Sequence, residues 1–432
     1  MFDRLIRFVK LTITERSRPV FRSIVAGLFD AGFASLATFV VGLYAARVFD
    51  PAILGAYALA FAAFTLAANI SAQLVFVPCQ VDSLSLERSR RLSVLGNSLK
   101  LGLPVAFLSA LAVSTWLLFS ASDLPREISE ALTFTAIACA LVSPVQDHVR
   151  RMLHLADMSW AAATVSTVQF LGISAFVLLF VASGIPSYWI PFGALTAANL
   201  LSLIIGAVLG SRAMKGRDAA RRFGIVDAVR SGRWLLIVVL LASGANFVAA
   251  ALVTQLAGAP ALGYAEAARI CAQPIWVLVM GLRAVLGPRS MEAARARDRH
   301  RAGRISGGFA ALVLLIGVAY VVAAGFDWWG NPLARLLPNA YAVPYLVLLW
   351  ILGNIVIGLQ SSPRAELIGG GREVGLAVAE FWSSLVRTAI SATARVTDSF
   401  AMPVGVLLAA LVRWLDYRRR AHRLYVEGEM KL

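Results

Sequence analysis

Apolar runs of about 20 residues, separated by short polar segments, recur from residue 23 to residue 415 of the chain. A helix of ~20 apolar residues matches the ~30 Å hydrocarbon layer of a bilayer, whereas barrel strands appear as alternating segments of ~10 residues. Only 15% of the residues are charged, below the ~25% typical of soluble domains. The sequence therefore predicts an all-α integral membrane protein.

Twelve transmembrane spans are predicted. They cover residues 23–47, 53–77, 93–119, 129–147, 159–183, 188–210, 234–256, 262–287, 305–325, 342–360, 374–391 and 399–415. An even number of spans places both chain ends on the same side of the membrane. We expect this chain to be a multi-pass protein of a bacterial inner membrane, because no segment reads as an organelle signal or a cleavable signal peptide.

Positive charge is distributed unevenly between the two sides of the predicted topology. The ends and the loops on their side hold 32 of the 40 Lys and Arg residues. The opposite loops contain Arg126, Arg335 and Arg395, with Arg47 at a helix end. The positive-inside rule makes the basic side cytoplasmic. The same rule accounts for the net charge of +16 without a nucleic-acid partner.

The sequence repeats itself at nearly half its length. LGAYALAF (Leu54–Phe61) returns as LGYAEAAR (Leu262–Arg269), which defines a first alignment of the chain with itself. Gln146, Arg150 and Leu153 return as Gln360, Arg364 and Leu367, which defines a second alignment of nearly equal offset. Each copy holds an even number of spans, so the repeat predicts two parallel six-helix halves around a central cavity.

The repeat and the charge pattern together divide the chain into five expected units. They are a basic amphipathic segment (1–22), the first half (23–210), a basic cytoplasmic linker (211–233), the second half (234–415) and a basic tail (416–432).

Ionisable residues inside the spans are the first candidates for function, because charges are costly at membrane depth and normally face a bundle interior or a hydrated cavity. The cationic ones are Arg47, Lys100, Arg269, Arg283 and Arg387, and the acidic ones are Asp30, Glu266 and Glu380. At 100° per residue, one helical face holds Glu266, Arg269, Gln273 and Arg283, as in a helix that lines a hydrated path. Alternatively, Glu266 and Arg269 pair with each other, and Arg47, Lys100 and Arg283 extend toward the interface.

The cationic excess favours an anionic substrate, and arginine suits phosphate because its planar donors bind two oxygens at once. The acids are candidates for holding arginines in place or for binding a coupling proton or sodium ion. Three amides, Asn69, Gln73 and Asn246, either line the cavity or join helices. The four histidines fall in predicted cytoplasmic loops, and neither they nor the three cysteines show metal-ligand spacing. We therefore expect no metal, no cofactor and no catalytic residue.

Four segments carry a resemblance to a known family. They are ARVFDPAILGAYALAF (Ala46–Phe61), LAGAPALGYAEAAR (Leu256–Arg269), LGPRS (Leu286–Ser290) and ELIGGGREVG (Glu366–Gly375). Together with the twelve spans they resemble the Wzx-type polysaccharide flippases of the MOP exporter superfamily. The chain departs from that family at Asn246, where an Asp is common.

The resemblance implies movement of an undecaprenyl-diphosphate-linked oligosaccharide from the cytoplasmic to the periplasmic leaflet by alternating access. The implied partners are this lipid-linked substrate, the bilayer and a polysaccharide polymerase or export complex. A multidrug or metabolite antiporter of the same superfamily is an alternative, and it predicts dominant acids in the cavity. A polysaccharide polymerase or glycosyltransferase is a second alternative, although no large catalytic loop or Asp-rich metal site is present. A purely structural membrane protein is a third.

Overall fold

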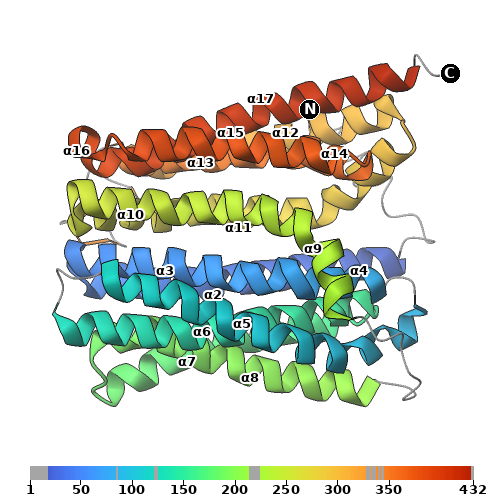
Figure 1. Cartoon of the computed structure of the whole chain (residues 1–432). Coiled ribbons are helices and arrows are strands. Elements are labelled where there is room, and N and C mark those ends of the chain that lie inside the picture. The colour runs from blue at the N-terminus through green and yellow to red at the C-terminus, as the bar shows by residue number, and fades with distance from the viewer. Residues whose placement is uncertain are drawn as a thin grey trace.

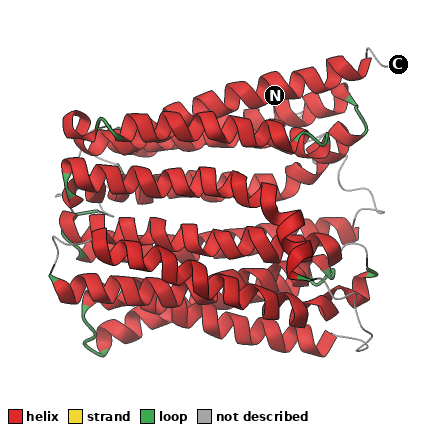
Figure 2. Cartoon of the chain, in the orientation of Figure 1, coloured by secondary structure: helices red, strands yellow, loops and turns green. Residues whose placement is uncertain are grey.

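The computed structural model describes residues 18–83, 86–120, 125–213, 224–326, 331, 337–338, 341 and 345–429. The regular secondary structure of these residues is helical, with no strand (Figure 2). Within the same described residues eleven helices are long and apolar enough to cross a membrane, and the chain is a multi-pass membrane protein. The span expected at 374–391 is the helix Glu373–Ser391, which is not among those eleven and which contains Glu373, Glu380 and Arg387. This arrangement is consistent with twelve spans in two halves, which remains a prediction.

The helices fall into two groups along the chain. The first half of the chain forms α2 (Arg18–Val48), α3 (Pro51–Ser71), α4 (Val77–Ser83), α5 (Leu95–Ser120), α6 (Arg126–Leu155), α7 (Ser159–Ala182) and α8 (Ile190–Ala213). The second half forms α9 (Ile225–Val239), α10 (Ala245–Ala257), α11 (Ala259–Arg295), α12 (Arg299–Ala324), α13 (Leu346–Leu359), α14 (Ser361–Gly369), α15 (Glu373–Ser391), α16 (Ala394–Thr397) and α17 (Ala401–Glu429). In Figure 1 the helices α2–α8 lie in the lower part of the molecule and α10–α17 in the upper part.

Several helices run past the ends predicted from hydropathy. The fourth predicted span ends at residue 147, but α6 continues to Leu155 and includes His148 and His154, which the sequence had placed in a loop. Likewise, α17 continues through the predicted basic tail to Glu429. Hydropathy falls where the first charges appear, whereas the backbone hydrogen bonds of α6 and α17 continue beyond them. Residues 1–17 of the amphipathic segment expected at 1–22, and residues 214–223 of the linker expected at 211–233, lie outside the described residues.

Two π-turns interrupt the helices that contain Asn69 and Asn246. One, η2 (Ala72–Phe76), separates α3 from α4, and the other, η5 (Leu240–Gly244), separates α9 from α10. The Asn69 side chain donates a hydrogen bond across to Ser243 Oγ in η5 (3.1 Å). The first and second halves therefore meet where both helices deviate from regular α geometry.

The first turns of α3 and α11 cross at very close range. A Cβ atom added to Gly55 would lie 1.9 Å from the carbonyl oxygen of Ala259, and one added to Gly263 would lie 2.0 Å from that of Pro51. The first alignment of the repeat maps one contact onto the other, so the crossing is symmetric. The Leu-Gly pair of the repeated motif is therefore explained by packing, because only glycine leaves room for the facing backbone.

Helix ends recur in the second alignment. Asp157 and Gly371, which are equivalent in it, both adopt positive φ (62° and 68°). The backbone N–H that follows each of these residues donates to a carbonyl in the last turn of the preceding helix. In α6 the bond runs from Met158 N to Leu153 O (2.8 Å), and in α14 it runs from Arg372 N to Leu367 O (2.9 Å). Gly184 and Asp398 form another such pair with positive φ. This backbone recurrence is consistent with two related halves.

We predict that Gly55→Ala and Gly263→Ala each destabilise the protein, by about 1–3 kcal/mol, because an added methyl group forces α3 and α11 apart. Thermal unfolding of the purified protein in detergent measures the effect. Gly32→Ala in α2 is the matched control, because its Cβ would meet nothing within 4 Å and Ala is the better helix former. Equal melting temperatures for all three variants would contradict the tight crossing.

Candidate functional site

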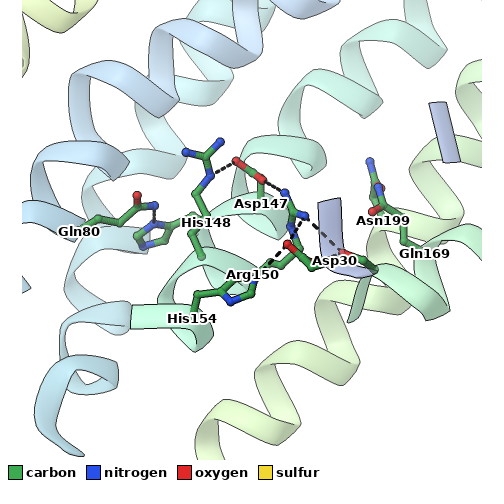
Figure 3. A network of polar contacts seen from close by, with 10 residues as sticks. Asp30, Gln80, Asp147, His148, Arg150, His154, Gln169 and Asn199 are labelled. Carbon is green, nitrogen blue, oxygen red and sulfur yellow. Dashed lines mark hydrogen bonds and ion pairs between the residues drawn. The ribbon is translucent and has the colours of Figure 1, made fainter. Parts of the chain in front are cut away.

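A buried ion network joins three helices of the first half (Figure 3). Asp30 of α2 accepts from Arg150 Nη1 of α6 (2.9 Å) and from Ser166 Oγ of α7 (2.5 Å), and His154 Nε2 lies 3.0 Å from the same carboxylate. Arg150 also binds Asp147, whose other oxygen accepts from Arg151 Nε (2.7 Å). Two carboxylates thus meet two guanidinium groups. This network is balanced in charge and leaves little attraction for an anion.

Two further polar links tie the first half together. His148 is buried, stacks on Phe76 with ring centres 4.5 Å apart, and lies within hydrogen-bonding distance of Gln80 (2.9 Å) and Ser98 (2.7 Å). Gln169 donates to Asn199 (2.6 Å), which in turn donates to Ser143 (2.7 Å). These contacts connect side chains on α4, α5, α6, α7 and α8 and on η2. Their role is to fix the helices of the first half relative to one another.

The second half contains a cavity of about 170 Å³. Its polar lining consists of Arg283 from α11, Gln360, Ser361 and Arg364 at the junction of α13 and α14, Glu380 from α15, and Arg413 and Tyr417 from α17. Apolar side chains, among them Val238 and Val239 of α9, complete the wall. Charged groups from four helices therefore converge on a space inside the bundle.

One acid in this cavity is already neutralised. Arg413 donates to Glu380 Oε2 through Nη1 (2.7 Å) and to Gln360 through Nε (2.6 Å), and the Tyr417 hydroxyl donates to Glu380 Oε1 (3.1 Å). Among the described residues Arg283 and Arg364 form no ion pair, and the buried Nε of Arg364 has no acceptor. The cavity therefore carries a surplus of two positive charges.

The predicted polar face of the segment 262–287 divides into three parts. Glu266 and Arg269 form a bidentate ion pair, in which Arg269 Nε donates to Glu266 Oε2 (2.7 Å) and Arg269 Nη2 donates to Glu266 Oε1 (2.7 Å). The Arg269 guanidinium also lies 5.4 Å from the centre of the Phe61 ring. Gln273 instead donates to Thr38 of α2 (3.1 Å). Only Arg283 lines the cavity. The geometry thus realises the alternative in which Glu266 and Arg269 pair with each other.

The other predicted site residues lie apart from the cavity. Arg47 and Lys100 are exposed at the ends of their helices' apolar stretches. Arg387 is buried in α15, with an Nε atom that has no acceptor among the described residues, but it does not line the cavity. Gln73 and Asn246 are half-buried.

Sequence reasoning missed several residues that the structure brings together. Asp147 is the last residue of the predicted span 129–147 and was not singled out, Arg364 lies beyond the span 342–360, and Arg413, near the end of the last span, was counted only among the charges of the C-terminal end. The available signal was the recurrence of Gln146 and Arg150 as Gln360 and Arg364. That recurrence was used only as a sign of the repeat. It also indicated that Arg150 and Arg364 occupy equivalent positions in the two halves and are both candidate site residues.

We predict that Asp30→Asn destabilises the protein by about 3–5 kcal/mol, because it leaves Arg150 buried without one of its two carboxylate partners. Chemical unfolding in detergent, followed by tryptophan fluorescence, measures the loss. The control is Glu130→Gln, since the pair formed by Arg126 and Glu130 is exposed to solvent and should contribute little. An Asp30→Asn protein as stable as this control would show that the network is dispensable.

No protein-family model matches the sequence, and no protein of curated function does so either. Solved structures of similar fold exist. An inward-facing multidrug resistance MATE family transporter of the MOP superfamily aligns over 90% of this chain and 95% of its own, with a TM-score of 0.64 and 13% identity. A MOP superfamily transporter from Pyrococcus furiosus, described as having a binding pocket of reverse polarity that suggests a different function, aligns over 94% and 96%, with a TM-score of 0.64 and 13% identity.

The eukaryotic MATE transporter AtDTX14 aligns over 94% of this chain and 97% of its own, with a TM-score of 0.68 and 13% identity. Identity at this level carries information about the fold alone. The chain therefore has the fold of the MATE transporters of the MOP superfamily.

Proposed function

We propose that this protein is a transporter that flips an undecaprenyl-diphosphate-linked oligosaccharide from the cytoplasmic to the periplasmic leaflet of a bacterial inner membrane. The observation that carries the proposal is that Arg283 and Arg364, which form no ion pair with any residue that the structure describes, line one cavity among the membrane helices. A chain with the MATE fold supports movement by alternating access, with one half rocking against the other.

The charge of the cavity favours a phosphate-containing headgroup. Arg283 and Arg364 are half-buried. Withdrawing a guanidinium from water without a counter-charge is costly, and an anionic ligand reduces that cost. Arginine offers parallel N–H donors that match two phosphate oxygens at once. Since Glu380 is already held by Arg413 and Tyr417, it does not compete for Arg283 or Arg364.

The size of the cavity restricts what part of the substrate it accepts. Its volume of about 170 Å³ is below the ~300–1,000 Å³ of pockets that enclose drug-sized ligands. It therefore suits a diphosphate rather than a complete oligosaccharide. The sugar would occupy hydrated space between the halves, and the lipid tail would stay in the bilayer.

Arg269 provides a second, weaker position along the same helix. Arg269 and Arg283 both belong to α11, and at ~1.5 Å per residue they lie about 21 Å apart along the helix axis. Because Glu266 neutralises Arg269, an anion is held less tightly there than beside Arg283 and Arg364. A substrate that moves from the cavity toward Arg269 thus passes from stronger to weaker binding, which favours release.

Binding alone does not set a direction for transport. A proton or sodium gradient, or removal of the product by a polysaccharide polymerase, would supply it. Both termini would lie in the cytoplasm, on the basic side of the molecule.

A multidrug antiporter is the second candidate, and Glu366 of α14 is the observation that favours it. This buried carboxylate accepts from the Tyr425 hydroxyl (3.0 Å) and from Ser362 (3.4 Å), and no ion pair to it exists among the described residues. A cationic drug would need an acid of this kind. However, the acids Asp30, Glu266 and Glu380 are all paired with arginine, which weighs against that candidate.

We predict that Arg283→Gln and Arg364→Gln each lower substrate flipping by about tenfold or more, because each removes a charge-assisted contact to the diphosphate. The assay measures lipid-linked oligosaccharide that reaches the periplasmic leaflet in a deletion strain carrying each variant. Lys100→Gln, in the exposed part of α5, is the control and should complement fully.

The deletion strain itself discriminates between the candidates. Lipid-linked oligosaccharide trapped in the cytoplasmic leaflet supports the flippase. Sensitivity to cationic dyes without trapped oligosaccharide would support the antiporter instead, and accumulation of unlinked precursors would support a polymerase or glycosyltransferase.

A further inference from the structure

The cavity of the second half occupies the place that the ion network occupies in the first half. In the second alignment, the network residues Asp147, Arg150 and Ser166 correspond to Ser361, Arg364 and Glu380, and Gln146, which precedes Asp147, corresponds to Gln360. In the first alignment, Asp30 corresponds to Val238. All of these counterparts line the cavity. The two places are therefore equivalent positions of a repeated scaffold.

The backbone supports this correspondence. Helices α7 and α15, which carry Ser166 and Glu380, begin at equivalent positions of the second alignment, Ser159 and Glu373. The positive-φ residues Asp157 and Gly371, which end the helices bearing the two arginines, are equivalent in the same alignment. Val238 and Val239, which precede the π-turn η5, both line the cavity. The part of α9 that lines the cavity thus consists of valine and contributes no acid.

The equivalent positions differ in their acids. In the first half, both Asp30 and Asp147 bind Arg150. In the second half Val238 and Ser361 stand in their places, so Arg364 lacks both carboxylates. The one acid gained, Glu380 in place of Ser166, is bound by Arg413. Arg283 then adds a further positive charge to the wall.

We propose that the cavity is an oxyanion site in which a ligand's phosphate oxygens take the position relative to Arg364 that the Asp30 carboxylate takes relative to Arg150. Val238 determines this specificity by leaving the position free of an internal acid. The ligand class is a phosphate or diphosphate, with Arg283 as the second cationic contact. The inference rests on the proposed function only where it identifies this anion as the headgroup of the transported lipid.

An internal carboxylate at position 238 is a strong competitor for Arg364. A tethered group acts at an effective concentration in the millimolar range or above, without any loss of translational freedom. Asp30 shows the result in the first half, where the guanidinium is occupied and no cavity ligand is required. Adding an acid at position 238 should therefore convert the open site into a closed network.

The test compares Val238→Asp with Val238→Asn, which differ in charge but hardly in size. Binding of inorganic pyrophosphate, inorganic phosphate and farnesyl diphosphate to the purified protein is measured by calorimetry, and the thermal shift that each ligand causes is recorded. Wild type and Val238→Asn should bind pyrophosphate alike. Val238→Asp should bind it at least about tenfold more weakly, because one charge-assisted interaction is lost.

Arg364→Gln is the second variant, and it should lose pyrophosphate binding without any new acid. Farnesyl diphosphate bound more tightly than pyrophosphate identifies a lipid headgroup as the source of the anion, whereas equal affinities identify a free phosphate compound. Equal pyrophosphate binding by Val238→Asp and Val238→Asn, or binding of chloride as tight as that of pyrophosphate, would overturn the inference.

These outcomes are separable from the proposed function. If the site fails but the deletion strain still traps lipid-linked oligosaccharide, the flippase stands and its anion contact lies elsewhere. If pyrophosphate binds and Val238→Asp abolishes binding, but no lipid-linked oligosaccharide is trapped in the deletion strain, the oxyanion site stands and the transported compound is another phosphate.

Discussion

A guanidinium group among membrane helices must find a counter-charge, and this requirement governs the polar interior of the protein. Arg150, Arg269 and Arg413 each meet a carboxylate of the chain itself. The pairs of Arg150 with Asp30 and of Arg413 with Glu380 join different helices, whereas Arg269 and Glu266 both belong to α11. Each pair satisfies the same requirement for a counter-charge. Arg283, Arg364 and Arg387 meet no acid in the described part of the chain. Arg283 and Arg364 differ from Arg387 because they line one cavity, where the proposed anion would meet both.

The membrane character and the helix-forming segments were predictable from sequence, because hydrophobic length alone specifies a spanning helix. The helix ends were less predictable. His148 and Leu155 belong to α6, and Asp416 belongs to α17, although charged residues around them lower the hydropathy. Hydropathy measures the preference of side chains for lipid, whereas the end of a helix depends on capping and on positive-φ residues such as Asp157.

The site was only partly predictable for a different reason. Arg283 was visible because it interrupts an apolar run, but its cavity partner Arg364 was hidden among the charges of an expected loop. Which arginines are neutralised depends on contacts between distant segments, such as Asp30 with Arg150 and Glu380 with Arg413. A single sequence shows the charges but not these pairings. The internal repeat is the exception, because the amino-acid sequence alone relates Arg150 to Arg364.

The location of the ion pairs bears on how such a protein can move. The pairs formed by Arg150, Arg269 and Arg413 each lie within one half of the chain. Polar contacts between the halves include single hydrogen bonds, from Asn69 to Ser243 and from Gln273 to Thr38, each worth only about 1 kcal/mol. The ion pairs thus lie inside single halves, whereas hydrogen bonds and the apolar packing of α11 against α2 and α3, with its glycine crossing, join the halves. A movement of one half against the other, as the proposed transport requires, would leave the ion pairs intact and would have to change these hydrogen bonds and this packing.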